Sequence, residues 1–281
     1  MIETAQQLKA LVRNLSKGDS AKAQVIMSSY ATERFLERVA LSPYRDNLIL
    51  KGGALIASMV GLANRSTMDI DTTIINMTLS EEAVLSMVEE ICAIPLSDNM
   101  TFEIKSVRPI MDEADYPGIR VLMEASLDRI RTPMKIDFST DDVITPKEIS
   151  YPVKLLFEDR TISLLAYNLE TILAEKMQTV IARGVANTRM RDFYDIFTLG
   201  GSYADLIDAK VLQDAFHATS IKRGTATDSV TIAKTLERID GNSDVPRLWN
   251  SYGKKFDYTK SITWENVISA VTRMFSLIQD S

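Results

Sequence analysis

Two adjacent glycines, Gly52 and Gly53, stand between a short apolar run and a stretch that can form two helical turns. The run at residues 48–50 suits a buried strand, and the helix is expected over residues 54–60 and closed by Gly61. Because neither glycine has a side chain, a phosphate can approach the backbone closely, and the free N–H groups of a helix start attract it. This stretch is therefore a candidate phosphate site.

Two aspartates spaced by one residue, Asp69 and Asp71, follow in a segment rich in β-branched residues that predicts a strand. Side chains alternate along a strand, so both carboxylates point the same way while Ile70 points into the core. Two neighbouring carboxylates repel each other unless a cation lies between them. Oxygen ligands suit Mg²⁺, which binds through one or two carboxylates and completes its shell with water and substrate phosphates. We therefore expect Asp69 and Asp71 to hold a divalent metal ion.

Each feature has an ordinary interpretation when it is taken alone. A Gly-Gly pair is most often a turn or a helix cap, and a lone Asp-x-Asp is most often a solvated strand edge. The two features together, in fixed order on strand, helix and strand, are much less expected by chance than either feature alone. The order favours a site that transfers a nucleotide from a metal-bound triphosphate.

Residues 51–74 read KGGALIASMVGLANRSTMDIDTTI and resemble the polymerase-β-like nucleotidyltransferases, and among them the AbiEii-type toxins of abortive-infection and toxin–antitoxin systems. In that family Ser or Thr usually follows the glycines, whereas this chain has Ala54. The resemblance therefore implies that backbone N–H groups, Lys51 and Arg65 hold the phosphates, with Thr67 as a further nucleotide-binding candidate.

The resemblance also implies a fold and a division of the chain. The expected fold class is α/β (α+β), a nucleotidyltransferase core with a mixed sheet followed by a mostly helical domain. We place the core with its N-terminal helices at residues 1–150 and the helical domain at residues 151–281, with the substrates in the cleft between them.

Local patterns agree with this division. Thr4 and Gln7 predict a capping box at the start of a helix that ends near Gly18. Further helices are expected at residues 20–40 and 80–91, and alternating strands at residues 102–105, 120–124 and 134–138. A loop is predicted from Asp112 to Gly118, and the chain beyond Pro152 is expected to be mostly helical.

A third acidic candidate, Asp137, lies on the polar face of its predicted strand together with Lys135 and Ser139. Alone, this is an exposed Lys and Asp on a two-faced sheet. The resemblance implies that Asp137 lies beside the Asp69 and Asp71 pair, as a metal ligand or as a base toward an attacking hydroxyl.

Lys176 lies on the apolar stripe of a helix expected from Asn168. A lysine in that position either extends its ammonium group to water or has a buried anionic partner. The surrounding ETILAEKMQTVIARG resembles the second-domain motif of the AbiEii family. The resemblance implies that Lys176 faces the active site, where a triphosphate would be its partner.

The next helix start resembles the family's Arg-x-Lys/Arg-Asp-x-x-Asp signature at Arg189, Arg191, Asp192 and Asp195. Alone, the two aspartates are a solvated helix face with a favourable acidic first turn. The resemblance implies that Asp192 belongs to the catalytic set and that Asp195 orients basic neighbours. The arginines are candidates for contacts with nucleotide or acceptor phosphate, with salt bridges as the alternative.

Composition limits the possible partners and compartments. The net charge of −6 argues against nonspecific coating of nucleic acid, although a local basic pocket remains compatible with it. A single cysteine, Cys92, excludes an internal disulfide and fits a reducing cytoplasm. We expect neither a signal peptide nor a membrane anchor, because the N-terminus lacks a basic region before its apolar part and no apolar run approaches the ~20 residues needed to span a bilayer.

Two further segments are weaker candidates. Residues 249–264 interleave aromatic and basic residues, a pattern that suits either stacking on single-stranded RNA or a polar loop packed by its own aromatic rings. His217 is the only histidine, and we expect it to be structural or on the surface.

The AbiEii resemblance implies transfer of a nucleotide from an NTP, with GTP as the first choice, to an acceptor hydroxyl on tRNA, with Mg²⁺ and release of pyrophosphate. It implies a growth-arresting toxin that limits phage and is counteracted by a separately encoded antitoxin. Two alternatives stay open: a small-molecule, antibiotic-modifying nucleotidyltransferase, and a nucleotide-binding regulator without transfer activity, which Ala54 favours.

Overall fold

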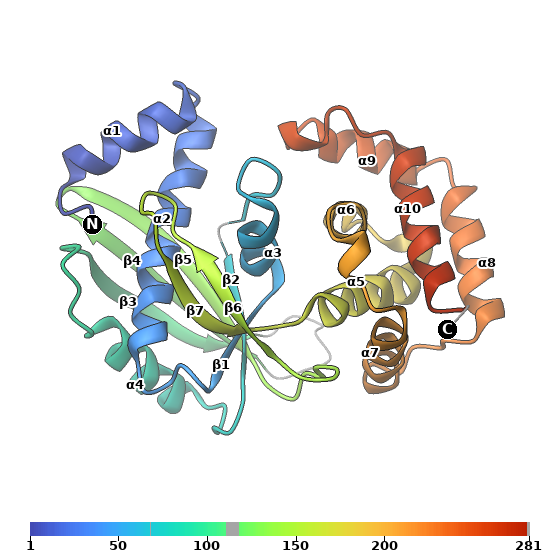
Figure 1. The fold of residues 1–281 in the computed structure, drawn as a ribbon, viewed down its shortest axis with the longest axis horizontal. Coiled ribbons are helices and arrows are strands. Elements are labelled where there is room, and N and C mark those ends of the chain that lie inside the picture. Colours follow the sequence, from blue (N-terminus) through green and yellow to red (C-terminus); the bar gives the residue numbers. More distant parts are fainter. Residues whose placement is uncertain (68, 111–117, 280–281) are drawn as a thin grey trace. The chain divides into compact units, whose positions relative to one another are not determined.

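The computed structural model describes residues 1–67, 69–110 and 118–279, and the chain forms two compact units (Figure 1). The first unit is Met1–Asp142 with Ile149–Ala166, and the second is Val143–Glu148 with Tyr167–Ser281. The first unit thus reaches past residue 150, because Ile149–Ala166 joins its sheet.

In its described residues, the first unit combines four helices with one seven-stranded sheet. The helices are α1 (Ala5–Ser16), α2 (Ser20–Leu41), α3 (Gly52–Val60) and α4 (Glu81–Cys92). The strands are β1 (Leu48–Lys51), β2 (Asp69–Ile74), β3 (Thr101–Pro109), β4 (Gly118–Leu127), β5 (Ile130–Ser139), β6 (Ile149–Lys154) and β7 (Thr161–Ala166). The spatial order is β3-β4-β5-β2-β1-β7-β6.

The sheet is mixed, which confirms the expected fold class. β2 pairs with β5 and β1 pairs with β7 in parallel, and the other neighbouring strands are antiparallel. Residues 111–117, which make up nearly all of the loop predicted from Asp112 to Gly118, lie outside the described part of the chain, and Gly118 itself begins β4.

The expectation that the chain beyond Pro152 is mostly helical is wrong for β6 and β7. β6 is an edge strand in which Val153 alone is buried, so it lacks the alternating apolar pattern that would identify it in the sequence. Proline is tolerated on an edge strand because it has no N–H to donate to a ladder. Pro152 therefore lies within a strand instead of marking the end of strand structure.

The local signals of the first unit are confirmed. Thr4 and Gln7 form the capping box of α1, and Ser80 caps α4. The core lies on the sheet face covered by α2 and α4, where Phe35 contacts Phe102 with ring centroids 6.0 Å apart and Ile136 is fully buried.

Helices dominate the second unit (Figure 1). They are α5 (Leu169–Arg183), α6 (Met190–Ser202), α7 (Ala209–Lys222), α8 (Ser229–Asp240), α9 (Val245–Gly253) and α10 (Trp264–Leu277), with short 3₁₀ turns at Gly184–Ala186, Ala204–Leu206 and Asp257–Thr259. Asn168 caps α5 as its sequence predicts, because its side chain accepts a hydrogen bond from the Thr171 N–H at 2.8 Å. Within the described residues, none of the helices has the length and apolar character that a membrane crossing requires.

Candidate active site

The two glycines bring the start of α3 against the carboxylate of Asp71. Gly52 has a φ of +63°, and a Cβ built on it would lie 2.2 Å from Oδ2 of Asp71. The N–H of Gly53 donates to the same oxygen at 3.4 Å. α3 begins at Gly52, two residues earlier than expected. The side chain of Lys51, the N-cap residue, makes no capping hydrogen bond, so the Asp71 carboxylate accepts from the helix start in its place.

A row of charged residues crosses five strands at this level of the sheet. Lys51 on β1 is opposite Asp71 on β2, Asp71 is opposite Asp137 on β5, and Asp137 is opposite Arg120 on β4. The row ends at Arg108 on β3. Opposite residues in neighbouring strands share a sheet face. The structure thus brings together Asp71 and the predicted third aspartate, Asp137, through strand register.

Two of the candidate carboxylates have basic partners on the same sheet face. Asp69 pairs with Lys135, with Oδ2 and Nζ 2.8 Å apart. Arg120 donates from Nε and Nη2 to the two oxygens of Asp137, both at 2.8 Å. A two-bond pair of this kind is among the stronger charge-assisted contacts. All four side chains are partly exposed, between 19% and 40%.

Lys51 is held by a carboxylate that the sequence analysis did not single out. Its Nζ donates to Oδ2 of Asp142 at 2.5 Å and to Oγ of Ser139 at 2.7 Å. Asp142 also accepts hydrogen bonds from Thr73 and Ser139. Burial disfavours the Asp142 carboxylate, but the Lys51 charge and these hydrogen bonds outweigh it and lower the pKa of that carboxyl below its usual range.

Arg65 and Thr67 lie beside Gly53. A Cβ on Gly53 would be 2.9 Å from Oγ1 of Thr67 and 3.5 Å from Nη2 of Arg65. Arg65 is 1% exposed, and its Nη1 donates to the carbonyl of Ser66 at 2.7 Å. The predicted phosphate-binding residues of the first unit are therefore gathered around the start of α3.

The donor set of this sheet face suits Mg²⁺. Asp69 and Asp71 offer carboxylate oxygens from one face of β2, and Asp137 lies opposite Asp71. Mg²⁺ typically binds through one or two carboxylates and takes its other ligands from water and substrate phosphates. Within the described residues, no group of three or more His, Cys, Asp or Glu side chains is arranged to hold a metal ion.

In the second unit, Lys176 has buried anionic partners instead of extending its ammonium group to water. Its Nζ lies 2.7 Å from Oδ1 of Asp192 and 3.5 Å from Oδ2 of Asp195. Lys176 is 18% exposed, whereas the Asp195 side chain is fully buried. The interpretation of the two aspartates as a solvated helix face is therefore wrong: both lie inward, toward α5.

The other candidates of the second unit lie nearer the surface. Arg189 and Arg191 are exposed. Residues 249–264 are not one polar loop, because they span α9, a 3₁₀ turn and the start of α10. Their rings do pack together, with Trp249 and Trp264 buried and Phe256 stacked on Tyr258 at 5.5 Å. His217 is exposed on α7.

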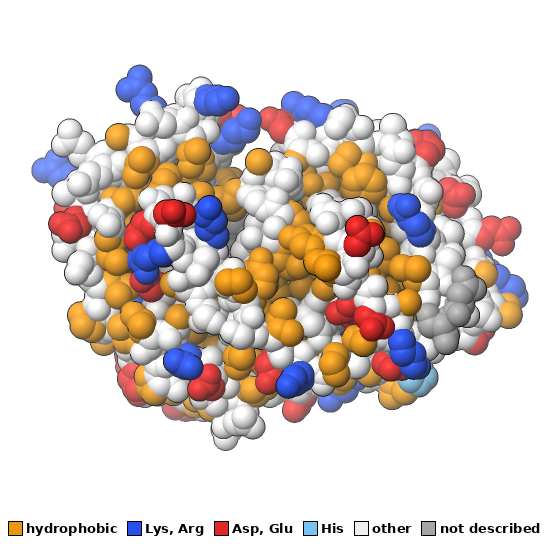
Figure 2. Space-filling view, in the orientation of Figure 1, with side chains coloured by type: hydrophobic (Ala, Val, Ile, Leu, Met, Phe, Trp, Pro, Cys, Tyr) orange, Lys and Arg blue, Asp and Glu red, His pale blue; other side chains and the backbone are white. Residues whose placement is uncertain are grey.

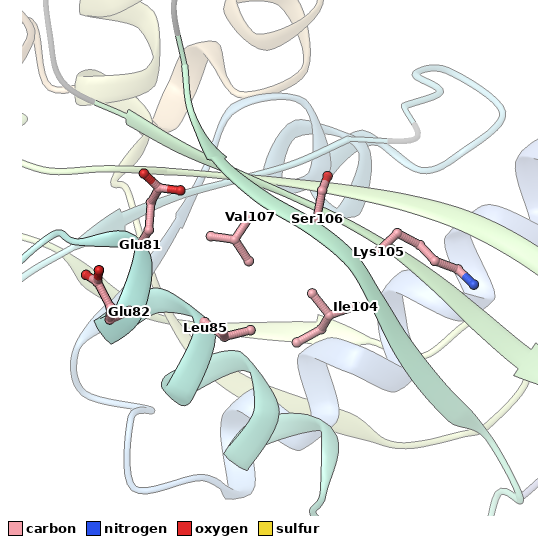
Figure 3. Close-up of a pocket in the computed structure, with 7 residues that line it drawn as sticks. All are labelled: Glu81, Glu82, Leu85, Ile104, Lys105, Ser106 and Val107. Carbon is pink, nitrogen blue, oxygen red and sulfur yellow. The ribbon is translucent and has the colours of Figure 1, made fainter.

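Of two hollows in the first unit, one lies away from the candidate site and the other includes part of it. One, of about 350 Å³, lies between α4 and the edge strand β3, where Leu85, Ile104 and Val107 point into it and Lys105 points away (Figure 3). It has no residue of the candidate site. The other, of about 400 Å³, includes Asp69 and Lys135 together with residues of α2 and β5.

Residues 34–270 match the family described as nucleotidyl transferase AbiEii toxin, type IV TA system. The chain belongs to this family. Membership makes this AbiEii-family protein an enzyme of the nucleotidyltransferase class, as its sequence predicts. No curated protein matches the chain.

Solved structures similar to this AbiEii-family protein share little sequence with it. JHP933 from Helicobacter pylori is 13% identical, with 92% of this chain and 94% of that chain covered and a TM-score of 0.50, which supports the fold. An H. pylori chain described as a candidate nucleotidyltransferase is also 13% identical, with coverages of 92% and 97% and a TM-score of 0.49. An antigenic nucleotidyltransferase-like protein from Paracoccidioides brasiliensis is 14% identical, with coverages of 84% and 95% and a TM-score of 0.37.

Sequence reasoning missed the partners of the charged candidates. Arg120 belongs to a strand that was predicted, and alternation places it on the polar face, but only the register puts it opposite Asp137. Asp142 follows β5 in the chain and reaches Lys51, 91 residues earlier in the sequence. No local pattern joins residues at that separation.

Proposed function

We propose that this AbiEii-family protein transfers a nucleotide from a nucleoside triphosphate, with GTP tested first, to an acceptor hydroxyl at the end of a tRNA. The acceptor oxygen would form a bond to the α-phosphorus while the bond from that phosphorus to the bridging oxygen breaks and pyrophosphate leaves. The arrangement of Asp69 and Asp71 on one strand face, beside the Gly52–Gly53 start of α3, is the observation that carries the proposal.

The proposed roles follow the chemistry of the first unit. Asp69 and Asp71 would hold Mg²⁺, which when bound supplies charge neutralisation at the phosphates. The N–H groups at the start of α3, with Arg65 and Thr67, would bind phosphate oxygens. Lys51 would contribute its ammonium group, which Asp142 and Ser139 hold in place.

Asp137 would serve as a further metal ligand or accept the proton of the acceptor hydroxyl. The latter role requires Arg120 to release it, because both Asp137 oxygens accept hydrogen bonds from that guanidinium group. In the second unit, Lys176 and Asp192 would act in the same reaction, with Lys176 stabilising developing negative charge. Arg189 and Arg191 are proposed contacts for nucleotide or acceptor phosphate, and their exposure supports this role.

Incubation with α-labelled NTPs and either total RNA or aminoglycosides tests the proposal. We expect label on RNA of tRNA size, with GTP as the best donor, and loss of at least about 100-fold in rate for Asp69→Asn. Asp46→Asn is the matched control, because Asp46 is an exposed aspartate whose side chain is 76% accessible. Label on aminoglycosides alone would assign the enzyme to antibiotic modification.

The biological setting is part of the same proposal. We propose a growth-arresting toxin that limits phage and is opposed by a separately encoded antitoxin. This setting requires that expression of the active enzyme stop growth. We expect wild-type protein to arrest growth and folded Asp69→Asn protein to have no effect. Arrest by both would favour a nucleotide-binding regulator without transfer activity.

A further inference from the structure

Lys135 and Arg120 form ion pairs with two of the three carboxylates in the candidate site. The Asp69–Lys135 pair has an Oδ2–Nζ distance of 2.8 Å, and the Asp137–Arg120 pair has two hydrogen bonds of 2.8 Å. A metal ion bound at these carboxylates would bring positive charge close to both basic groups. The pairs and a bound metal ion therefore compete for the same oxygens.

The strand register fixes the backbones of both pairs and leaves the long side chains able to turn. Lys135 is directly opposite Asp69, and Arg120 is directly opposite Asp137. The side chains of Lys135 and Arg120 are 30% and 24% exposed, so neither is enclosed by its surroundings. Exchange of partners thus requires no change of strand register.

Lys51 and Arg65 do not share this freedom. Lys51 is 14% exposed and donates to the buried Asp142, and Arg65 is 1% exposed. Lys51 and Arg65 are therefore held in place, whereas Lys135 and Arg120 are more exposed. A guanidinium group suits phosphate oxygens as well as carboxylates because its donors form a planar fork.

We propose, on the basis of the function proposed above, that Lys135 and Arg120 are exchangeable counter-ions of the site. Before substrate binds, they neutralise Asp69 and Asp137. When metal-bound triphosphate binds, they leave the carboxylates to the metal and donate to triphosphate oxygens. The binding of metal and the binding of triphosphate are therefore coupled. The metal alone binds weakly because it must displace Lys135 and Arg120, and the triphosphate then gives both side chains new anionic partners.

Two binding titrations test the exchange in the full-length protein. The variants are Lys135→Gln and Arg120→Gln, with Arg131→Gln as the matched control. Arg131 lies on the same face of β5, is 51% exposed and pairs with Glu124 at 3.7 Å, so its loss removes one charge without touching the site carboxylates. Mn²⁺ alone is titrated by electron paramagnetic resonance, and an α,β-methylene GTP is titrated by calorimetry at saturating Mn²⁺.

We expect each site variant to bind Mn²⁺ alone about fivefold more tightly and the nucleotide about fivefold more weakly, whereas Arg131→Gln changes neither. Opposite changes in the Mn²⁺ and nucleotide affinities distinguish the exchange from general damage to the site, which weakens both affinities. Arg120→Lys should return Mn²⁺ affinity toward that of the wild type, because it restores the charge. If Arg120→Gln does not fold, Lys135→Gln carries the same test from a more exposed position.

Unchanged affinities in both site variants, or a parallel change of the two affinities, would overturn the exchange while leaving nucleotidyl transfer in place. A wild-type protein that binds neither Mn²⁺ nor nucleotide would overturn the proposed function and the exchange together.

Discussion

At Gly52 a single backbone position sets the distance between the start of α3 and the carboxylate of Asp71. The φ of +63° and the absence of a side chain both matter, because a Cβ there would lie 2.2 Å from Oδ2 of Asp71. The glycine pair was predicted as a place where phosphate approaches the backbone. In the structure the closest approach at Gly52 is by Asp71, so the same glycine also positions a candidate metal ligand.

We therefore expect Gly52→Ala to lower the free energy of unfolding by about 1–3 kcal/mol and to slow nucleotide transfer at least about tenfold. The left-handed backbone disfavours alanine, and the new methyl group must displace the carboxylate. Gly61→Ala is the control, because Gly61 has a φ of +85° but no atom within 4 Å of an added Cβ. Urea unfolding and labelled-NTP assays measure both effects. A Gly52→Ala enzyme with wild-type activity would contradict this role of the glycine.

At the scale of elements, α5 and α6 are joined by a polar contact inside an apolar surface. The ammonium group of Lys176 on α5 lies between Asp192 and Asp195 of α6. Such a pair can stabilise the helix contact, serve the reaction, or both. Removing one partner of a buried pair leaves the other charge uncompensated.

A double-variant cycle separates these roles. We expect Lys176→Met to lower the unfolding temperature and abolish transfer, because Asp192 and Asp195 lose the ammonium group of Lys176. Asp192→Asn added to Lys176→Met should recover part of the unfolding temperature, because it removes one unpaired charge, but none of the transfer activity. Thermal unfolding and labelled-NTP transfer are measured for all four proteins. Recovery of activity in the double variant would show that the pair is structural only.

A second element contact predicts a pH effect. Both oxygens of Glu33 on α2 accept a hydrogen bond from the Leu156 N–H of the β6–β7 turn, at 2.9 Å. Burial raises the pKa of the Glu33 carboxyl to about 7, against the opposing effects of this hydrogen bond and the Arg34 charge. The folded state then holds the proton more tightly than the unfolded state. Stability from this group is therefore complete below about pH 4.5 and lost as the pH rises toward 7.

We expect Glu33→Gln to remove that loss. The variant should be more stable than wild type by up to about 3 kcal/mol at pH 8 and close to wild type at pH 5. Urea midpoints at the two pH values measure the difference. Glu3→Gln is the control because Glu3 is exposed, and it should change neither midpoint. An equal difference at both pH values would show that Glu33 does not titrate as described.

At the scale of the whole molecule, charge limits how an RNA acceptor can bind. The chain has a net charge of −6. On the face shown in Figure 2, described Lys and Arg side chains are interspersed with Asp and Glu instead of forming one continuous basic surface. RNA binding with few phosphate contacts would depend only weakly on salt.

We therefore expect the affinity for a labelled acceptor RNA to fall only about tenfold between 50 and 200 mM salt, as a few neutralised phosphates require. Fluorescence anisotropy at the two salt concentrations measures it. Arg189→Gln should flatten the dependence further if Arg189 contacts a phosphate, and exposed Arg247→Gln serves as the control. A fall of about 1,000-fold would require a broad basic interface and would contradict this view.

The sequence alone determined the features that depend on residues close together in the chain, namely helix caps, helix ends and the alternation of side chains along strands. The capping box at Thr4, the end of α3 at Gly61, the alternation that puts Asp69 and Asp71 on one face and the helix from Asn168 all follow from local spacing. Family membership adds the enzyme class. These signals need no tertiary contact, because periodicity and caps act within a few residues.

Tertiary structure alone decided which charges meet. The register of β2, β5 and β4 sets Asp71, Asp137 and Arg120 in one row. Chain reversal also brings Asp142 to Lys51, and the packing of α5 against α6 gives Lys176 its carboxylates. These contacts join residues far apart in the chain, and a shift of one residue in register would turn the same side chains to the other face. The partners of the site residues therefore follow from strand pairing and helix packing, which no local pattern encodes.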